Sequence, residues 1–295
     1  MTSLQAILEQ DTKPALFIGN GVNRYDGLGD SSWEALLGEL ADASNVHLTK
    51  AEIKEMSNTE YYDILNLASR EIRQAALAQK FCDLMETWKP APTHHRLMDW
   101  AQRHDAPVLT VNFDENLSRA AGVEIQRNAH RFTDFYPWGC SYGTRPASNP
   151  SAEFGIWHPH GTRHYARSVR LGLRDYMGAV QRVRRRLYGD KDSLMAHLKV
   201  GSSWWGSDTW LDIIFNRPIL FFGFSFGQEE SFMRWLFIER ARLFNRAKRD
   251  APPLWFVEPR NEKSTARGKF FHYLGIEYVI VEDYSDLYEA PSWAS

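Results

Sequence analysis

The chain has 295 residues, of which 43% are hydrophobic and 24% charged, which is typical of a globular protein with one large or two small domains. The formal net charge is −2, so no overall positive field selects nucleic acid as a partner. Two cysteines, Cys82 and Cys140, cannot build a disulfide scaffold or complete a four-thiolate zinc site.

The N-terminal residues lack the basic and apolar segments of a secretory signal. No apolar run approaches the roughly 20 residues that a membrane-spanning helix needs. We therefore expect a cytoplasmic protein that does not insert into a membrane.

Short apolar segments alternate with helical patterns along the chain. The predicted strands lie at 14–18, 106–111, 154–160, 217–222, 252–259 and 276–282. The predicted helices lie at 30–44 (N-cap Ser31 or Ser32), 59–88 (one or two helices), 92–105 (N-cap Thr93), 171–200 and 229–248. Apolar strands separated by helices favour an α/β fold with a mostly parallel sheet that is covered by helices on both faces.

Polar and glycine residues stand where four of the predicted strands end. They are Gly19-Asn20-Gly21, Asn112 with Asp114, His158 with His160-Gly161, and Gly223 with Ser225. In open parallel sheets, ligands bind beyond the carboxyl ends of the strands. We therefore expect these residues to share one site.

The first two of these groups each allow two interpretations. Gly19 and Gly21 could form a tight turn, or they could let the phosphates of a ligand approach the backbone before a helix N-terminus. Asn112 and Asp114 could form an Asx turn that caps a helix, or they could hold a ribose or a water molecule. The two interpretations of Asn112 and Asp114 are compatible.

The histidines of the "WHPHG" segment also have two interpretations. Either could be a buried structural side chain, or one could serve as a general base, because imidazole titrates near neutral pH. Pro159 makes regular strand pairing unfavourable between them, and no further ligands stand nearby in a familiar metal-binding pattern. We predict no metal site.

The segment "GFSFG" matches the G-x-S-x-G nucleophile elbow of serine hydrolases, with Ser225, Glu258 and His272 in a permitted chain order. Two observations disfavour this interpretation. His272 lies inside an apparently helical segment, and only 70 residues follow Ser225. A separate basic stretch, from Arg167 to Arg186, is typical of a solvated helix face, with a subunit interface or a nucleic-acid patch as alternatives.

Taken in order, the motifs resemble those of the sirtuin (SIR2) family. Within that resemblance, the chain looks more like the SIR2-like NAD hydrolase domains of bacterial antiphage defence proteins. The resemblance covers nearly the whole chain and rests on these matches: "FIGNGVNRYDGLGDSSWEALL", "PTHHRLMDWAQRHDAPVLTVNFDENLSRAAG", "WHPHG", "LGLRDYMGAV", "GFSFGQEES", "LWFVEP" and "LGIEYVIVEDY". It implies one Rossmann-like SIR2-like domain over 1–295, with a core at roughly 1–32, 101–170 and 216–295 and a smaller helical module at roughly 33–100 and 171–215.

The resemblance also implies a role for each matching position. Asn112 would hold the attacking water or the nicotinamide ribose, Asp114 would support that geometry, and His160 would be the base. The residues expected to bind NAD are Gly19, Asn20, Gly21, Asn23, Gly223, Ser225 and Glu258. Gly19 and Gly21 would cradle the pyrophosphate, and Gly223, Ser225 and Glu258 would contact the adenosine half.

The sequence departs from the family pattern in two places. Asn20 and Asn23 stand where the glycine turn usually has alanine and serine. Residues 161–222 contain no cysteine, whereas protein-deacylating sirtuins carry four zinc-binding cysteines there. That zinc module helps to form the acyl-peptide cleft, so its absence favours water as the acceptor.

The implied activity is hydrolysis of NAD+ to nicotinamide and ADP-ribose, with NAD as substrate and no metal. Such an activity would require control, so we expect a homo-oligomer or a separate regulatory partner or phage trigger, with nucleic acid involved at most indirectly. The alternatives are an NAD or ADP-ribose sensor without turnover, an NAD-dependent protein deacylase, and the serine hydrolase.

Overall fold

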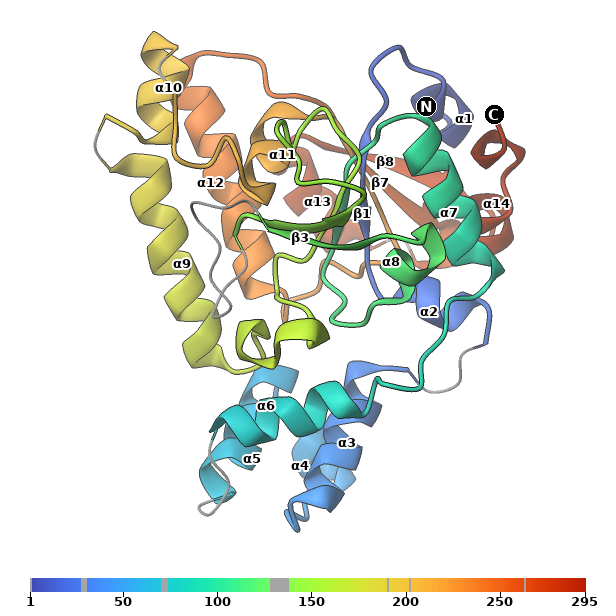
Figure 1. The fold of residues 1–295 in the computed structure, drawn as a ribbon, viewed down its shortest axis with the longest axis vertical. Helices are drawn as coiled ribbons and strands as arrows, with labels where there is room; N and C mark the ends of the chain where they lie inside the picture. The colour runs from blue at the N-terminus through green and yellow to red at the C-terminus, as the bar shows by residue number, and fades with distance from the viewer. Residues whose placement is uncertain are drawn as a thin grey trace.

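The computed structural model describes residues 2–27, 31–69, 74–127, 138–189, 191–201, 203–262 and 264–295. Within these ranges, eight strands form one sheet in the order β3-β4-β5-β2-β1-β6-β7-β8 (Figure 1). The strands are β1 (Ala15–Ile18), β2 (Val108–Thr110), β3 (Glu124–Arg127), β4 (Cys140–Gly143), β5 (Ile156–Trp157), β6 (Ile219–Phe222), β7 (Leu254–Pro259) and β8 (Ile276–Val281).

The six strands from β5 to β8 in this order are parallel, whereas β3 and β4 add an antiparallel edge. The α/β fold class and its mostly parallel sheet are therefore confirmed. The edge strands β3 and β4 were not predicted, because "EIQR" and "CSYG" show neither an apolar run nor a clear alternation.

The chain reverses direction across the sheet between β1 and β6. From β1 it builds outward through β2 and β5, and it then returns to place β6 on the other side of β1. Such a switch point opens a crevice at the carboxyl ends of the two central strands. The glycine turns after β1 and β6 therefore meet there.

Helices cover both faces of the sheet because successive side chains of each strand point to opposite faces. Phe17 and Phe221 pack with α9 to α13 on one face, whereas Leu16 and Leu220 pack with α1, α2, α7, α8 and α14 on the other. The helices are α1 (Leu4–Leu8), α2 (Gly21–Tyr25), α3 (Trp33–Ala43), α4 (Lys50–Lys54), α5 (Asn58–Ala68), α6 (Gln74–Asp83), α7 (Pro92–Arg103), α8 (Asn116–Ala121), α9 (Leu173–Tyr188), α10 (Leu194–Val200), α11 (Trp210–Asn216), α12 (Ser231–Ala247), α13 (Thr265–Leu274) and α14 (Tyr284–Tyr288), with 3₁₀ turns η1 (Arg163–Ser168), η2 (Arg260–Glu262) and η3 (Pro291–Trp293).

A third apolar cluster joins α3, α5 and α6 below the sheet (Figure 1). It also takes in Phe113, which follows β2, so this helical group is packed against the end of the sheet that carries the polar residues. The helices α7 and α9 to α11 instead cover the faces of the sheet. The grouping of 33–100 with 171–215 as one module stays a prediction.

Helix caps follow the local sequence in most cases. Ser32 caps α3 by accepting a hydrogen bond from the backbone N–H of Ala35 at 3.1 Å. The prediction of Thr93 as the N-cap of α7 is wrong, because α7 begins at Pro92 with Ala91 as its N-cap. Proline suits the first helical position because it has no N–H to leave unpaired.

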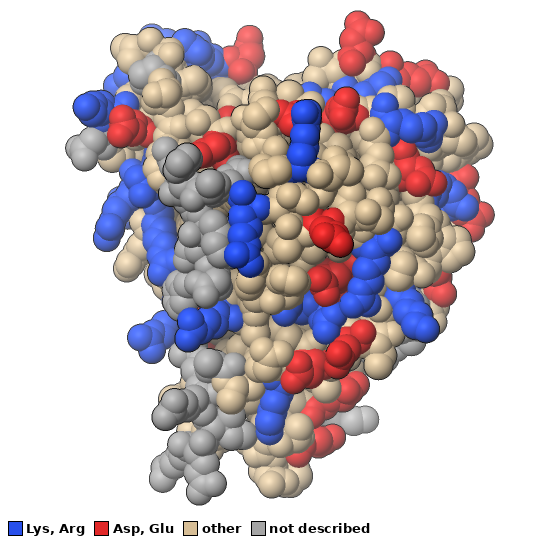
Figure 2. Space-filling model, viewed as in Figure 1, with Lys and Arg blue, Asp and Glu red and all other residues tan. Residues whose placement is uncertain are grey.

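The basic stretch lies mainly on α9. The apolar face of α9 packs against α12 and α10, and its arginines at 174, 182, 184, 185 and 186 are exposed. Figure 2 shows Lys and Arg side chains gathered along the edge of the molecule where α9 lies. Arg170, by contrast, is buried before the helix and lies 3.9 Å from Asp175. Within the described ranges, the helices are too short or too polar to cross a membrane.

Candidate active site

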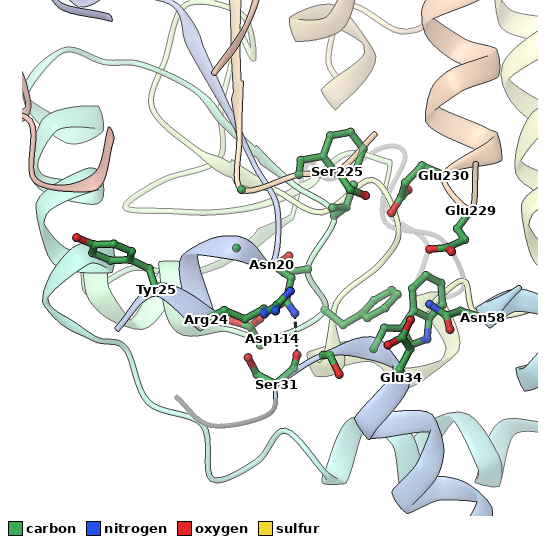
Figure 3. Close-up of a pocket in the computed structure, with 18 of the residues that line it drawn as sticks. Asn20, Arg24, Tyr25, Ser31, Glu34, Asn58, Asp114, Ser225, Glu229 and Glu230 are labelled. Atoms are coloured by element: carbon green, nitrogen blue, oxygen red, sulfur yellow. Dashed lines mark hydrogen bonds between the residues drawn. The ribbon is translucent and has the colours of Figure 1, made fainter. Parts of the chain in front are cut away.

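A cavity of about 650 Å³ lies at the carboxyl ends of the central strands, between the sheet and the helices α3, α5 and α6. Eight of the ten predicted site residues line it: Asn20, Gly21, Asn112, Asp114, His160, Gly223, Ser225 and Glu258. Figure 3 shows several of its side chains approaching from different elements of the fold. The structure thus brings residues from the ends of five strands, β1, β2, β5, β6 and β7, into one pocket.

The glycine turns after β1 and β6 are packed against each other. A Cβ atom on Gly19 would lie 2.3 Å from the carbonyl oxygen of Gly223, and one on Gly21 would lie 2.7 Å from its Cα. The N–H of Gly21 donates to that same carbonyl oxygen at 2.8 Å. Close approach of the two backbones therefore accounts for both glycines, whereas a pyrophosphate contact through them stays a prediction.

Gly223 itself requires the left-handed backbone region, with φ of +61°. A Cβ atom at this position would lie 2.7 Å from the hydroxyl oxygen of Tyr288. Tyr288 lines the cavity from α14, and burial raises the pKa of its hydroxyl. The turn after β6 thus has no room for a larger residue.

Asn23 lies at the centre of a buried hydrogen-bond network behind the pocket. Its Nδ2 donates to the Oδ1 of Asn20 and to the Oδ2 of Asp114, both at 2.8 Å. Its Oδ1 accepts from the Nδ2 of Asn116 at 2.9 Å and from the Nε2 of His94, also at 2.9 Å. Asn23 is fully buried and does not line the cavity, so a direct contact with NAD stays a prediction.

The tautomer of His94 follows from its two partners. The N–H of Ala91 donates to its Nδ1 at 3.1 Å, so the ring proton resides on Nε2, which donates to Asn23. Burial lowers the pKa of His94, which keeps the imidazole neutral and able to accept from Ala91. The network in turn orients Asn20, which donates to the carbonyl oxygen of Ser31 at 2.7 Å (Figure 3).

Asn112 differs from Asn23 because its amide is buried without a partner. The side chain is 7% exposed and lines the cavity, yet neither its Nδ2 nor its Oδ1 bonds to any part of the chain that the structure describes. Its backbone is held firmly: the N–H donates to the Oγ1 of Thr110 at 3.1 Å, and the carbonyl oxygen accepts from the Nδ1 of His158 at 2.9 Å. An unpaired buried amide costs free energy, which indicates a position kept ready for a ligand.

The two histidines of "WHPHG" have different roles. His158 is a structural side chain that supports the Asn112 backbone, and its complete burial lowers its pKa. His160 is 2% exposed, lines the cavity, and its Nε2 lies 3.1 Å from the Oε2 of Glu230. The Nδ1 of His160 has no hydrogen-bond partner within the described ranges.

Glu258, at the end of β7, is paired with Arg267 of α13 through its Oε1. Arg267 also donates to the backbone oxygens of Ser225 at 3.2 Å and of Glu262 at 2.8 Å. One guanidinium therefore ties the ends of β6 and β7 together. The second oxygen of Glu258, Oε2, is buried without a partner among the described residues, so it is free to accept from a ligand hydroxyl.

The arrangement around Ser225 does not resemble a hydrolase triad. The hydroxyl of Ser225 accepts from the N–H of Gly227 at 3.3 Å, and no histidine in the described ranges bonds to it. His272 is exposed on α13, and Glu258 is engaged by Arg267. A nucleophile elbow strains the serine itself, but in this segment positive φ is found at Gly223 and Phe226 and not at Ser225.

Several pocket residues were missed by sequence reasoning. Glu230 precedes α12, Arg267 lies on α13, and Trp33 enters from α3. None of them stands directly at a strand end, and although Trp33 and Glu230 fall inside matched segments, only the folded chain places their side chains at the site. Glu229 also lines the cavity, where burial and the neighbouring carboxylates of Glu34 and Glu230 raise its pKa.

A crevice at the switch point of a mostly parallel sheet is typical of Rossmann-like proteins. The family model described as SIR2-like domain matches residues 107–279, more than half of the chain, so the chain belongs to the SIR2-like family. The predicted resemblance is confirmed at this level, and the family uses NAD. A comparison with curated proteins gave no significant match. Within the described ranges, no three His, Cys, Asp or Glu side chains gather as they would around a metal ion.

Proposed function

We propose that this SIR2-like protein hydrolyses NAD+ to nicotinamide and ADP-ribose. The observation that carries the proposal is the amide of Asn112, which is buried, unpaired within the described ranges and part of the same cavity as His160. A cavity of about 650 Å³ is in the range that encloses a small organic ligand. The fit to NAD rests on this cavity, the unpaired amide and the unpaired oxygen of Glu258.

The bond that breaks joins C1′ of the ribose to the nicotinamide nitrogen. Nicotinamide leaves as a neutral molecule with the bonding electron pair, so the protein need not protonate it. Positive charge develops on the ribose, and a water oxygen forms the new bond to C1′. The tasks left to the protein are to hold the ribose, to exclude other nucleophiles and to align one water.

The described residues can divide these tasks. The Oδ1 of Asn112 accepts from the water or a ribose hydroxyl, and its Nδ2 donates to a ribose oxygen. His160 accepts the proton that the attacking water loses. Asp114 keeps its supporting role, because its Oδ1 accepts from the N–H of Asn116 at 2.9 Å and its Oδ2 from Asn23. The adenosine half would lie toward Ser225 and Glu258.

In the cell we propose that this activity depletes NAD as part of a regulated antiphage response. Uncontrolled NAD loss would harm the host, so we expect the enzyme to be silent until it assembles as a homo-oligomer or meets a partner protein or a phage signal. Turnover is therefore to be measured over a range of protein concentrations.

The proposal is tested by incubating the purified chain with NAD+ and measuring nicotinamide and ADP-ribose by chromatography. Asn112→Ala and His160→Ala should each lower kcat by about 100-fold or more, the range for lost polar stabilisation or a lost general base. Asn245→Ala, which changes an exposed asparagine on α12, is the matched control. Full activity in Asn112→Ala would contradict the proposal.

Three other outcomes identify the alternatives. Saturable NAD+ binding without turnover at every protein concentration favours a sensor. Turnover that requires an acylated peptide favours a deacylase. Ester hydrolysis that is lost in Ser225→Ala but not in Asn112→Ala favours the serine hydrolase.

A further inference from the structure

His160 has a carboxylate partner, Glu230, that was not among the predicted site residues. Its Nε2 lies 3.1 Å from the Oε2 of Glu230, and both side chains are largely buried, at 2% and 13% exposure. An ionised carboxylate can only accept a hydrogen bond, so Nε2 carries the ring proton and donates it to Glu230. In the neutral ring, the lone pair that can accept a proton then belongs to Nδ1.

The surroundings of the ring leave that nitrogen available. Nδ1 is buried and makes no hydrogen bond within the described ranges. The ring also contacts two aromatic side chains, Tyr176 at 5.1 Å and Phe232 at 5.9 Å between centroids. These contacts confine the ring plane but supply no acceptor in the ring plane, so the bond to Glu230 is the contact that sets the tautomer.

Glu230 is itself held in place by the backbone. It is the N-cap residue of α12. Its backbone N–H donates to the carbonyl oxygen of Gly227 at 3.2 Å, and its carbonyl oxygen accepts from the backbone N–H of Arg234 at 2.9 Å. Figure 3 shows Glu229 and Glu230 entering the pocket side by side from the segment that leads into α12. Only the second of the two bonds to His160.

We propose that Glu230 is the positioning residue for the His160 base, fixing the imidazole with its proton on Nε2 so that Nδ1 accepts the proton of the attacking water. This inference rests on the proposed NAD+ hydrolysis. As the water oxygen bonds to C1′ and nicotinamide leaves with its electron pair, one water proton moves to Nδ1. The resulting imidazolium is stabilised by the ionised Glu230, and the proton then passes to solvent. NAD+ and water thus yield nicotinamide, ADP-ribose and one proton.

The test combines a spectroscopic and a kinetic measurement on the full chain. Long-range ¹H–¹⁵N correlation spectra, with His160 assigned by His160→Ala, report which ring nitrogen carries the proton. We expect the Nε2–H tautomer in the wild type and a mixture of tautomers in Glu230→Ala. Glu229→Ala removes the neighbouring carboxylate and is the matched control, in which the tautomer of His160 should not change.

In the kinetic measurement, Glu230→Ala should lower kcat by about 10- to 100-fold, the usual effect of losing a group that orients a functional histidine. KM for NAD+ should change much less than kcat. Added formate, a small carboxylate that can occupy the vacated space, should restore part of kcat in Glu230→Ala but not in His160→Ala. A residue with a purely structural role would not be rescued in this way.

The outcomes separate the two proposals. If the wild type hydrolyses NAD+ but Glu230→Ala keeps both its tautomer and its kcat, the positioning role is wrong and the proposed function stands. If the wild type produces no nicotinamide at any protein concentration, even after an activating partner or phage signal is supplied, the proposed function fails, and the tautomer still decides whether Glu230 sets the ring. Should Glu230→Ala not fold, an Nδ1–H tautomer in the wild type would by itself overturn the inference.

Discussion

Replacing Asn23 by alanine should destabilise the protein far more than the same change at Asn112. Asn23 makes four side-chain hydrogen bonds, three of them buried, and one of these goes to the carboxylate of Asp114. A neutral bond contributes about 1 kcal/mol net and a bond to a charged group about 1.5–3 kcal/mol. Allowing for water that enters the vacated space, we expect Asn23→Ala to lower the free energy of unfolding by about 3–5 kcal/mol.

Asn112→Ala removes two buried polar atoms that have no partner in the described part of the chain. Each such atom costs about 1–3 kcal/mol in the folded state, so its removal offsets the packing that is lost with the side chain. We therefore expect little change in the free energy of unfolding, or a small increase. Activity should show a different pattern, because Asn112→Ala loses hydrolysis while remaining folded.

Urea unfolding followed by circular dichroism, together with thermal melts, measures both effects. For a chain of this length, about 1 kcal/mol corresponds to roughly 2 °C, so Asn23→Ala should melt about 6–10 °C below the wild type. Asn112→Ala should stay within about 2 °C of the wild type. The reasoning is refuted if the two variants are equally destabilised, or if Asn23→Ala melts with the wild type.

Three further predictions concern backbone space, pH and charge. Gly223→Ala should melt well below Gly201→Ala, because both have φ above +60° but only the new Cβ at 223 would meet the hydroxyl of Tyr288; equal melting temperatures would contradict this. Because burial lowers the pKa of His158, the unfolded chain binds more protons below its ordinary pKa of about 6.5. The contribution of neutral His158 to the free energy of unfolding should therefore be fully present above about pH 6.5 and should decrease as the pH falls. Urea unfolding at several pH values measures this, and the free energy of unfolding should fall less steeply with decreasing pH in His158→Gln than in the wild type. Arg267→Met should lower the free energy of unfolding by about 3 kcal/mol, since it leaves the buried carboxylate at the end of β7 without its cation; a melt unchanged from the wild type would show that solvent replaces the ion pair.

Much of the site could be read from the sequence because parallel sheets gather their strand ends at one edge. Asn112, His160 and Ser225 each follow a short apolar run, and that position alone predicts a shared pocket. The structure places all three in its lining. Their chemical roles stay predictions, because position along a strand does not tell which atoms meet a ligand.

The different contacts made by chemically identical side chains could not be predicted from the sequence. Asn23 and Asn112 have the same side chain, yet one has every hydrogen-bonding atom paired and the other has none. Likewise, His158 bonds to a backbone carbonyl and His160 to a carboxylate, although only one residue separates them. These differences depend on partners contributed by distant segments of the chain.

The sequence by itself determined the parallel α/β sheet, the strand ends that carry polar residues and the resemblance to the SIR2 family. It could do so because strand and helix periodicity and turn residues act over a few neighbouring positions. Only the tertiary structure decided that Gly19 and Gly21 are required by the approach of the turn at Gly223, and that Glu230 reaches His160. Those contacts join residues that are 70 or more positions apart in the chain, and they exist only once the sheet has brought its strand ends together.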